Sequence, residues 1–122
     1  FVAVVVYLMV SWGKFSFRAY NIHLGVMFGT IMAANVWMRI WPAQKKIIAA
    51  VKEGTAPDAG LVAMSGGRSR HNTYMSVPLI WTMINAHTTV TATNWWYLLV
   101  IVLLGWLSVA WVYKKAGTLK GF

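Results

Sequence analysis

Long apolar stretches separated by polar segments set the pattern of this chain. A helix needs ~20 residues to cross a bilayer, and three apolar stretches have about this length: 20–41, 72–89 and 95–112. A further apolar run, 1–12, is too short and predicts the end of an incomplete helix. Because the runs are continuous, without alternation of apolar and polar residues, helices are favoured over barrel strands. The sequence therefore predicts one all-α integral membrane domain over 1–122, a helical bundle of about four transmembrane helices in antiparallel hairpins, the first of them incomplete.

The polar segment 42–70 is predicted to be the loop between the second and third helices. Pro42 predicts the end of the preceding helix, because proline cannot donate the backbone hydrogen bond that would continue it. Residues 43–53 combine apolar and lysine positions at helical spacing, which predicts a short amphipathic helix on the membrane surface. Gly66-Gly67 predicts a turn, and Asn72 is the predicted N-cap of the next helix.

Composition and charge argue against an ordinary soluble domain. Charged residues make up 11% of the chain, whereas soluble domains carry about 25%. The net charge is +9, and nine of the eleven cations lie in or beside 42–70 or in the carboxyl tail, with only Lys14 and Arg18 elsewhere. The positive-inside rule then predicts that 42–70 and the carboxyl tail are cytoplasmic. Anionic lipid headgroups are the expected partner of these cations, at about 1 kcal/mol per cation, and nucleic acid is not.

Two histidines are candidates for a cofactor site near the outer face. His23 begins one predicted helix and His87 ends the next, so on antiparallel helices both come to the same level, and each has a Met one turn away, Met27 and Met83. Two imidazoles at equal depth can ligate the iron of a b-type haem, and imidazole with thioether also suits copper. The simpler alternative is that each His bonds a backbone carbonyl or water. Because the chain has no Cys, it carries no covalently bound haem c.

Small and polar residues on the second predicted helix point to helix contacts. Gly25, Gly29 and Ala33 recur at intervals of four, which favours close approach of another helix. Asn35 lies within the apolar stretch and is expected to find a hydrogen-bonding partner on a neighbouring helix. Arg39, at the end of the stretch, is expected to reach the headgroups.

The order and spacing of several motifs resemble a known family. These motifs are Ile22-His-Leu-Gly25, Thr30-Ile-Met32, Ala34-Asn-Val36, Pro42-Ala-Gln-Lys45, Gly54-Thr-Ala-Pro-Asp58 and Arg68-Ser-Arg-His-Asn72, followed by Tyr74, Pro78, Met83 and His87. Together they resemble the amino-terminal membrane domain of bacterial membrane-bound urate oxidase (urate hydroxylase), over approximately 20–97.

The resemblance implies a multi-pass protein of the bacterial inner membrane that oxidises urate and delivers electrons to a cytochrome c. Asn35, Arg39, His71 and Asn72, near the inner rim, are then the expected substrate-binding groups. A haem b on His23 and His87 is expected to take part in electron transfer.

Two further interpretations are open at this point, and so is whether the chain is itself an enzyme. One is a non-catalytic accessory subunit packed among other membrane subunits of a larger complex. The other is a transporter, although only Asn35, Ser76 and Pro78 approach the polar broken-helix sites that transporters place near the midplane.

Overall fold

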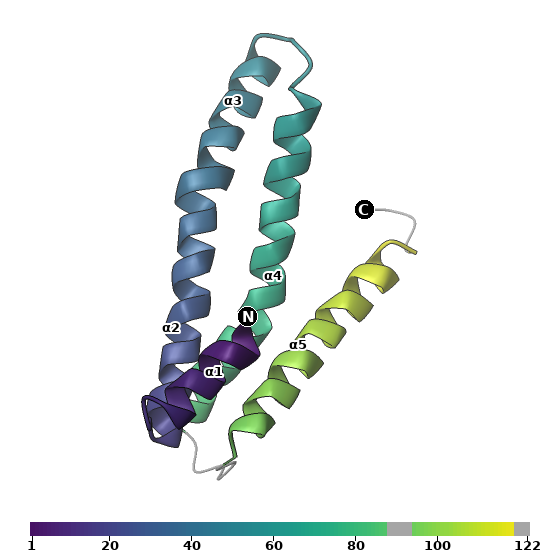
Figure 1. Ribbon diagram of the computed structural model, residues 1–122. Coiled ribbons are helices and arrows are strands. Elements are labelled where there is room, and N and C mark those ends of the chain that lie inside the picture. The colour runs from purple at the N-terminus through teal and green to yellow at the C-terminus, as the bar shows by residue number, and fades with distance from the viewer. Residues whose placement is uncertain (88–93, 119–122) are drawn as a thin grey trace.

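The computed structural model describes residues 1–87 and 94–118, and every regular element in this part of the chain is helical. The elements are α1 (Val2–Ser11), α2 (Phe17–Asn35), the π-helical turn η1 (Val36–Ile40), α3 (Trp41–Lys52), α4 (Ala59–His87) and α5 (Trp95–Ala116) (Figure 1). The prediction of an all-α chain is therefore confirmed over the described residues. The expected bundle of about four transmembrane helices stays a prediction.

The prediction that Pro42 ends its helix is wrong. α2, η1 and α3 form one continuous helix, Phe17–Lys52. In an unbroken α-helix the ring of Pro42 would clash with the carbonyl of Met38, four residues earlier. The wider turn of η1 lies at this point and accommodates the proline, so the helix continues.

Most of the predicted loop 42–70 is also helical, and only 53–58 connects α3 to α4. Gly54, with φ 71°, adopts the left-handed conformation that commonly follows a helix. Asp58 caps α4, because its Oδ1 accepts hydrogen bonds from the backbone N–H of Gly60 at 2.6 Å and of Leu61 at 3.3 Å.

Two smaller predictions within 42–70 are wrong because the residues concerned are helical. α4 begins at Ala59, so the predicted turn at Gly66-Gly67 is helical and Asn72 lies inside a helix instead of capping one. Packing overrides the local signals here: Ala43 of α3 and Ser65 of α4 are both buried in the chain. The amphipathic helix predicted over 43–53 exists as α3, but it continues α2 and packs against α4.

α4 packs against α2 on one side and α5 on another, and α1 contacts α2 and α5. A methyl group built on Gly25 would lie 2.5 Å from the Thr82 hydroxyl, so α2 and α4 approach closely only because this residue lacks a side chain. Nothing lies within 4 Å of the corresponding position of Gly29. The predicted small-residue stripe therefore makes a close contact at its first member. The core cluster consists of Val6, Tyr20, Leu24, Phe28, Leu98 and Val102.

Two helices of the described chain are long and apolar enough to cross a membrane, Phe17–Lys52 and Trp95–Ala116. They contain the expected spans 20–41 and 95–112. The expected span 72–89 lies in α4 up to His87, and its last two residues are outside the described part of the chain. Residues 90–93, which precede the next expected span, and Lys120 of the tail also lie outside it.

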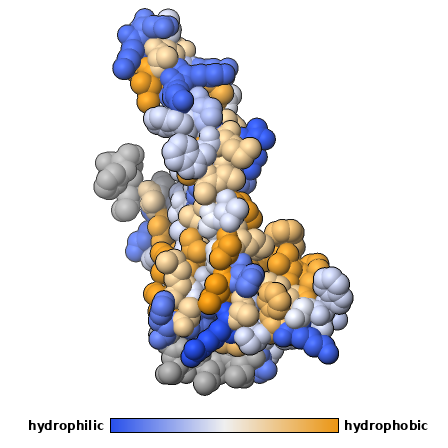
Figure 2. Space-filling view, turned by 90° about the vertical axis from the view of Figure 1, so that its left-hand side faces the viewer, coloured by the Kyte–Doolittle hydropathy of each residue, from blue (hydrophilic) through white to orange (hydrophobic). Residues whose placement is uncertain are grey.

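The hairpin of the long helix and α4 extends beyond the other elements (Figure 1). The extending part contains α3, the loop 53–58 and the beginning of α4. Hydrophilic residues gather at its end, whereas hydrophobic residues cover much of the opposite half of the face seen in Figure 2. The part of the hairpin that packs against α1 and α5 is therefore the more apolar part.

Candidate functional site

Polar side chains join the long helix to α4 along a line that we call the seam. Its hydrogen bonds include Asn21 Nδ2 to the Thr82 carbonyl at 3.0 Å, Asn35 Nδ2 to Asn72 Oδ1 at 2.9 Å, and Gln44 Nε2 to Ser65 Oγ at 2.9 Å. Since leaving a buried polar group unpaired costs about 1–3 kcal/mol, these bonds specify how the two helices align.

The central contact of the seam confirms the prediction that Asn35 bonds to a neighbouring helix. Asn35 is 8% exposed, and its partner Asn72 in turn donates from Nδ2 to the carbonyl of Met32 at 3.1 Å. Asn72 thus accepts from one residue of α2 and donates to another, which holds the Asn35 amide in one orientation.

A hollow of about 260 Å³ adjoins this contact, and we call it the Asn35 hollow. It brings together a permanent cation, a side-chain amide, an imidazole and two aromatic rings; its lining residues are Ile31, Asn35, Arg68, His71, Tyr74, Met75 and Trp106. The Nε1 of Trp106 is buried and has no hydrogen-bond partner within 1–87 and 94–118. This combination suits a planar ligand that carries negative charge and hydrogen-bonding edges.

The structure divides the four predicted substrate-binding residues. Asn35 and His71 line the Asn35 hollow, and Asn72 positions Asn35. Arg39 lines a separate hollow of about 110 Å³ with Pro42 and Lys46, among other residues. Arg39 therefore does not join the other three.

Arg68 and Trp106 are functional candidates that the sequence reasoning missed. In the sequence, Arg68 is one of the cations that indicate topology and begins one of the family motifs, and Trp106 lies within an apolar stretch; neither pattern assigns the residue to a site. Arg68 precedes His71 by three residues and Met75 by seven, so the spacing alone places them on one face of a helix. Trp106 comes from α5, and no local pattern relates it to α4.

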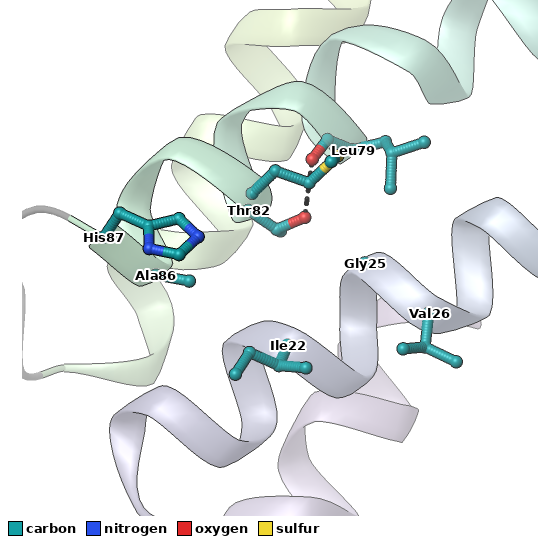
Figure 3. Close-up of a pocket in the computed structure, with 8 residues that line it drawn as sticks. Ile22, Gly25, Val26, Leu79, Thr82, Ala86 and His87 are labelled. Atoms are coloured by element: carbon teal, nitrogen blue, oxygen red, sulfur yellow. Dashed lines mark hydrogen bonds between the residues drawn. The ribbon is translucent and has the colours of Figure 1, made fainter.

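A second, larger hollow of about 450 Å³ lies between α2 and the end of α4 (Figure 3), and we call it the His87 hollow. Its lining is largely apolar: Ile22, Gly25, Val26, Leu79, Thr82, Met83, Ala86 and His87. The Thr82 hydroxyl already donates to the Leu79 carbonyl at 2.7 Å. The imidazole of His87 is therefore the only side-chain hydrogen-bond donor of this lining that is uncommitted within the described residues, and Met83 shares the hollow as its spacing predicts.

His23 does not face His87. His23 Nδ1 lies 2.7 Å from the Ala19 carbonyl, and its ring centroid is 5.0 Å from that of Phe15. Two residues along a helix turn a side chain by about 200°, and His23 is two residues from both Asn21 and Gly25, which contact Thr82 of α4. His23 therefore lies on the side of α2 away from α4.

This placement bears on the predicted haem ligands. The two rings do not form a ligand pair across the seam, and for His23 the simpler alternative, a bond to a backbone carbonyl, is what the structure has. Among the described residues, no three His, Asp or Glu side chains group together in a way that could hold a metal ion. Haem b on either histidine stays a prediction.

A family model described as "Urate oxidase N-terminal" matches residues 1–119, which include every helix of the described residues and the Asn35 and His87 hollows. Neither a curated protein nor a solved structure matches the chain.

Proposed function

Because this chain belongs to the urate oxidase N-terminal family, we propose that it forms part of the membrane domain of a bacterial urate-oxidising enzyme and that urate binds in the Asn35 hollow. The observation that carries the proposal is the meeting of Asn35, Arg68 and His71 from two helices around that hollow. Electrons from urate would pass to a separate cytochrome c.

The lining of the hollow matches the chemistry of urate, a planar oxopurine that is an anion at neutral pH. The guanidinium of Arg68 offers a permanent charge and paired donors for a carbonyl edge. The amide of Asn35 offers both a donor and an acceptor.

His71 is the residue of the hollow that suits proton transfer. Oxidation of urate releases protons together with electrons, and imidazole is the side chain whose usual pKa lies close to neutrality. His71 is exposed and lies on the face of α4 that carries Arg68. We assign it the role of proton acceptor next to the bound substrate.

The proposed membrane position follows from the charges. From Phe17 to Arg39 the long helix rises about 33 Å, close to the ~30 Å of a hydrocarbon core. At the Arg39 end, Arg70 lies over the ring of Tyr113, so α4 and α5 carry cations at the same level. With this end cytoplasmic in the inner membrane, the extended hairpin reaches into the cytoplasm.

A haem b would need a ligand from outside this chain's seam. His23 lies on the side of α2 away from α4, whereas His87 of α4 lines the hollow between the two helices. They therefore do not fit as two ligands of one iron between α2 and α4. No step of the proposed reaction depends on that cofactor.

A second candidate function is a non-catalytic accessory subunit. The exposed apolar side chains of α5 favour it, because such a face suits packing against other membrane subunits; among them are Leu103, Leu104, Leu107 and Trp111. This candidate predicts that variants in the Asn35 hollow leave urate oxidation unchanged.

The test uses bacterial membranes that contain the full-length protein, supplied with cytochrome c, with the ultraviolet absorbance of urate as the readout. We expect Arg68→Gln and His71→Ala to lower urate turnover at least tenfold. The matched control is Arg39→Gln, which removes the same charge from a separate hollow and should retain turnover. If Arg68→Gln and His71→Ala kept the turnover of the wild type, as the Arg39→Gln control should, the Asn35 hollow would be excluded as the urate site.

A further inference from the structure

One face of α5 carries two aromatic residues toward the Asn35 hollow. Trp106 lines the hollow directly. Tyr113 comes seven residues later, so it lies two helical turns, or about 10 Å, further along the same face. Gly105, next to Trp106, is where α5 approaches α4 closely, because a methyl group built on it would lie 3.3 Å from Pro78 Cδ. This approach sets the level at which both aromatic residues meet α4.

Tyr113 is seated on one turn of α4. Its hydroxyl donates to Thr73 Oγ1 at 3.2 Å, and the guanidinium carbon Cζ of Arg70 lies 5.2 Å from its ring centroid. The ring of Tyr74 stacks on the ring of Tyr113, with 6.0 Å between centroids and 22° between planes. Aromatic pairs attract each other at this distance. Three contacts with α4 therefore orient the Tyr113 ring.

Tyr74 connects this contact to the hollow. It is one of the residues that line the Asn35 hollow, whereas Tyr113 is not. The Tyr74 side chain is half-buried, and its hydroxyl makes no hydrogen bond to residues 1–87 or 94–118. Packing therefore orients the Tyr74 ring, and the stack on Tyr113 is part of that packing.

We propose that Tyr113 is a positioning residue for the urate site, and that it holds the Tyr74 ring as a wall on which the planar substrate stacks. Aromatic rings bind flat heterocycles through their faces, which leaves the edges of the substrate to Arg68 and Asn35. This role rests on the proposed function, because without urate in the hollow the wall has no ligand.

The orientation of Tyr74 then determines the apparent affinity for urate. When only a fraction of the protein has the competent conformation, the apparent affinity falls by that fraction. A Tyr74 ring that is correctly oriented for about one third of the time would raise KM about threefold. Because stacking holds the substrate and the transition state alike, kcat should not change.

A simpler role for Tyr113 is to pack α5 against α4. Loss of that packing would reduce the amount of folded protein and hence the maximal rate, but the folded molecules would keep their KM. A shift of α5 would also move Trp106, and its effect on KM would add to that of losing Tyr74. The value of KM and its dependence on Tyr74 therefore distinguish positioning from packing.

The experiment measures KM and kcat for urate in bacterial membranes that contain the full-length protein and are supplied with cytochrome c. Tyr74→Ala should raise KM at least tenfold, because the stacking surface is lost. Tyr113→Leu should raise KM about threefold and leave kcat unchanged. The double variant Tyr74→Ala and Tyr113→Leu should have the KM of Tyr74→Ala alone, because Tyr113 has no ring left to position.

Two further variants serve as controls. Tyr113→Phe keeps the ring that stacks on Tyr74 and should retain the KM of the wild type. Trp111→Leu removes an aromatic ring that is 61% exposed. It precedes Tyr113 by two residues and so lies on another face of α5. This variant should also retain the KM of the wild type.

Four outcomes would overturn the positioning role. An unchanged KM in Tyr113→Leu would show that Tyr74 keeps its orientation without its neighbour. A higher KM in the double variant than in Tyr74→Ala would mean that Tyr113 acts by another route. Equal increases in Tyr113→Leu and Tyr113→Phe would assign the effect to the hydroxyl, and equal increases in Tyr113→Leu and Trp111→Leu to a general loosening of α5.

The variants Arg68→Gln and His71→Ala separate this inference from the proposed function. If both keep the turnover of the wild type, the urate site itself is refuted, and the role of Tyr113 with it. If both lose turnover while Tyr113→Leu keeps the KM of the wild type, only the positioning role is refuted.

Discussion

Asn35 of α2 donates a hydrogen bond to Asn72 of α4, and Asn72 passes a second hydrogen bond back to the Met32 carbonyl. Asn35 lies directly before η1, the wider turn that allows the long helix to continue past Pro42. An amide pair in this position specifies the register of the seam beside the proposed urate site.

We expect Asn72→Ala to destabilise the protein by about 1–3 kcal/mol, because Asn35 Nδ2 would be buried without a partner. Unfolding in detergent, followed by circular dichroism, measures the loss. The double variant Asn35→Leu and Asn72→Leu should be less destabilised than the single one, since it leaves no orphaned amide. A single variant as stable as wild type would show that water replaces Asn72.

Gly25→Ala should disturb the α2–α4 crossing. The added methyl would lie 2.5 Å from Thr82 Oγ1, which is itself held by its bond to the Leu79 carbonyl. We expect a loss of about 1–3 kcal/mol from this overpacking. Gly29→Ala is the matched control, because nothing lies within 4 Å of the new methyl; it should be neutral, or stabilising by up to about 1 kcal/mol through helix propensity. Similar losses in both variants would contradict the crossing.

His23→Ala should leave the reduced-minus-oxidised visible spectrum of the purified full-length protein unchanged. The reason is that the His23 ring bonds its own helix and lies away from α4. If a b-type α-band is present and disappears in this variant, His23 is an iron ligand and its partner lies outside the seam.

Asp58→Ala should weaken the start of α4, because the backbone N–H groups of Gly60 and Leu61 lose their acceptor. We expect about 0.5–2 kcal/mol of destabilisation. Faster amide exchange over 59–62 in hydrogen–deuterium exchange mass spectrometry locates the effect. Asp58→Asn, which keeps a capping oxygen, should behave like wild type, and equally fast exchange in both variants would mean that charge matters more than the cap.

The helices could be predicted from the sequence because continuous apolar runs favour them strongly. The helix-breaking residues Pro42 and Gly66-Gly67 led to wrong predictions, because they interrupt isolated helices. In this structure α3 and α4 bury residues against each other, and a wider turn accommodates the proline. The true ends at Gly54 and Asp58 carried ordinary capping signals in the sequence.

The candidate site was predictable only in part. The depth of Asn35 correctly implied a partner on another helix, but the identity of Asn72 depends on where the hairpin turns. The sequence places His23 and His87 at the same level along antiparallel helices. Contact between them also requires that the face of α2 that carries His23 meets α4, and it does not. Trp106 comes from a different helix, so only tertiary packing relates it to Arg68.

The unequal lengths of the helices have a consequence for proteolysis. The long helix has 36 residues and α5 has 22, so by length alone the former rises about 21 Å further. In the membrane position proposed above, a protease that cuts within 53–58 would therefore work well away from the lipid surface. The two fragments should stay associated after the nick, held by the Asn21, Asn35 and Gln44 hydrogen bonds, and co-purify until a denaturant separates them.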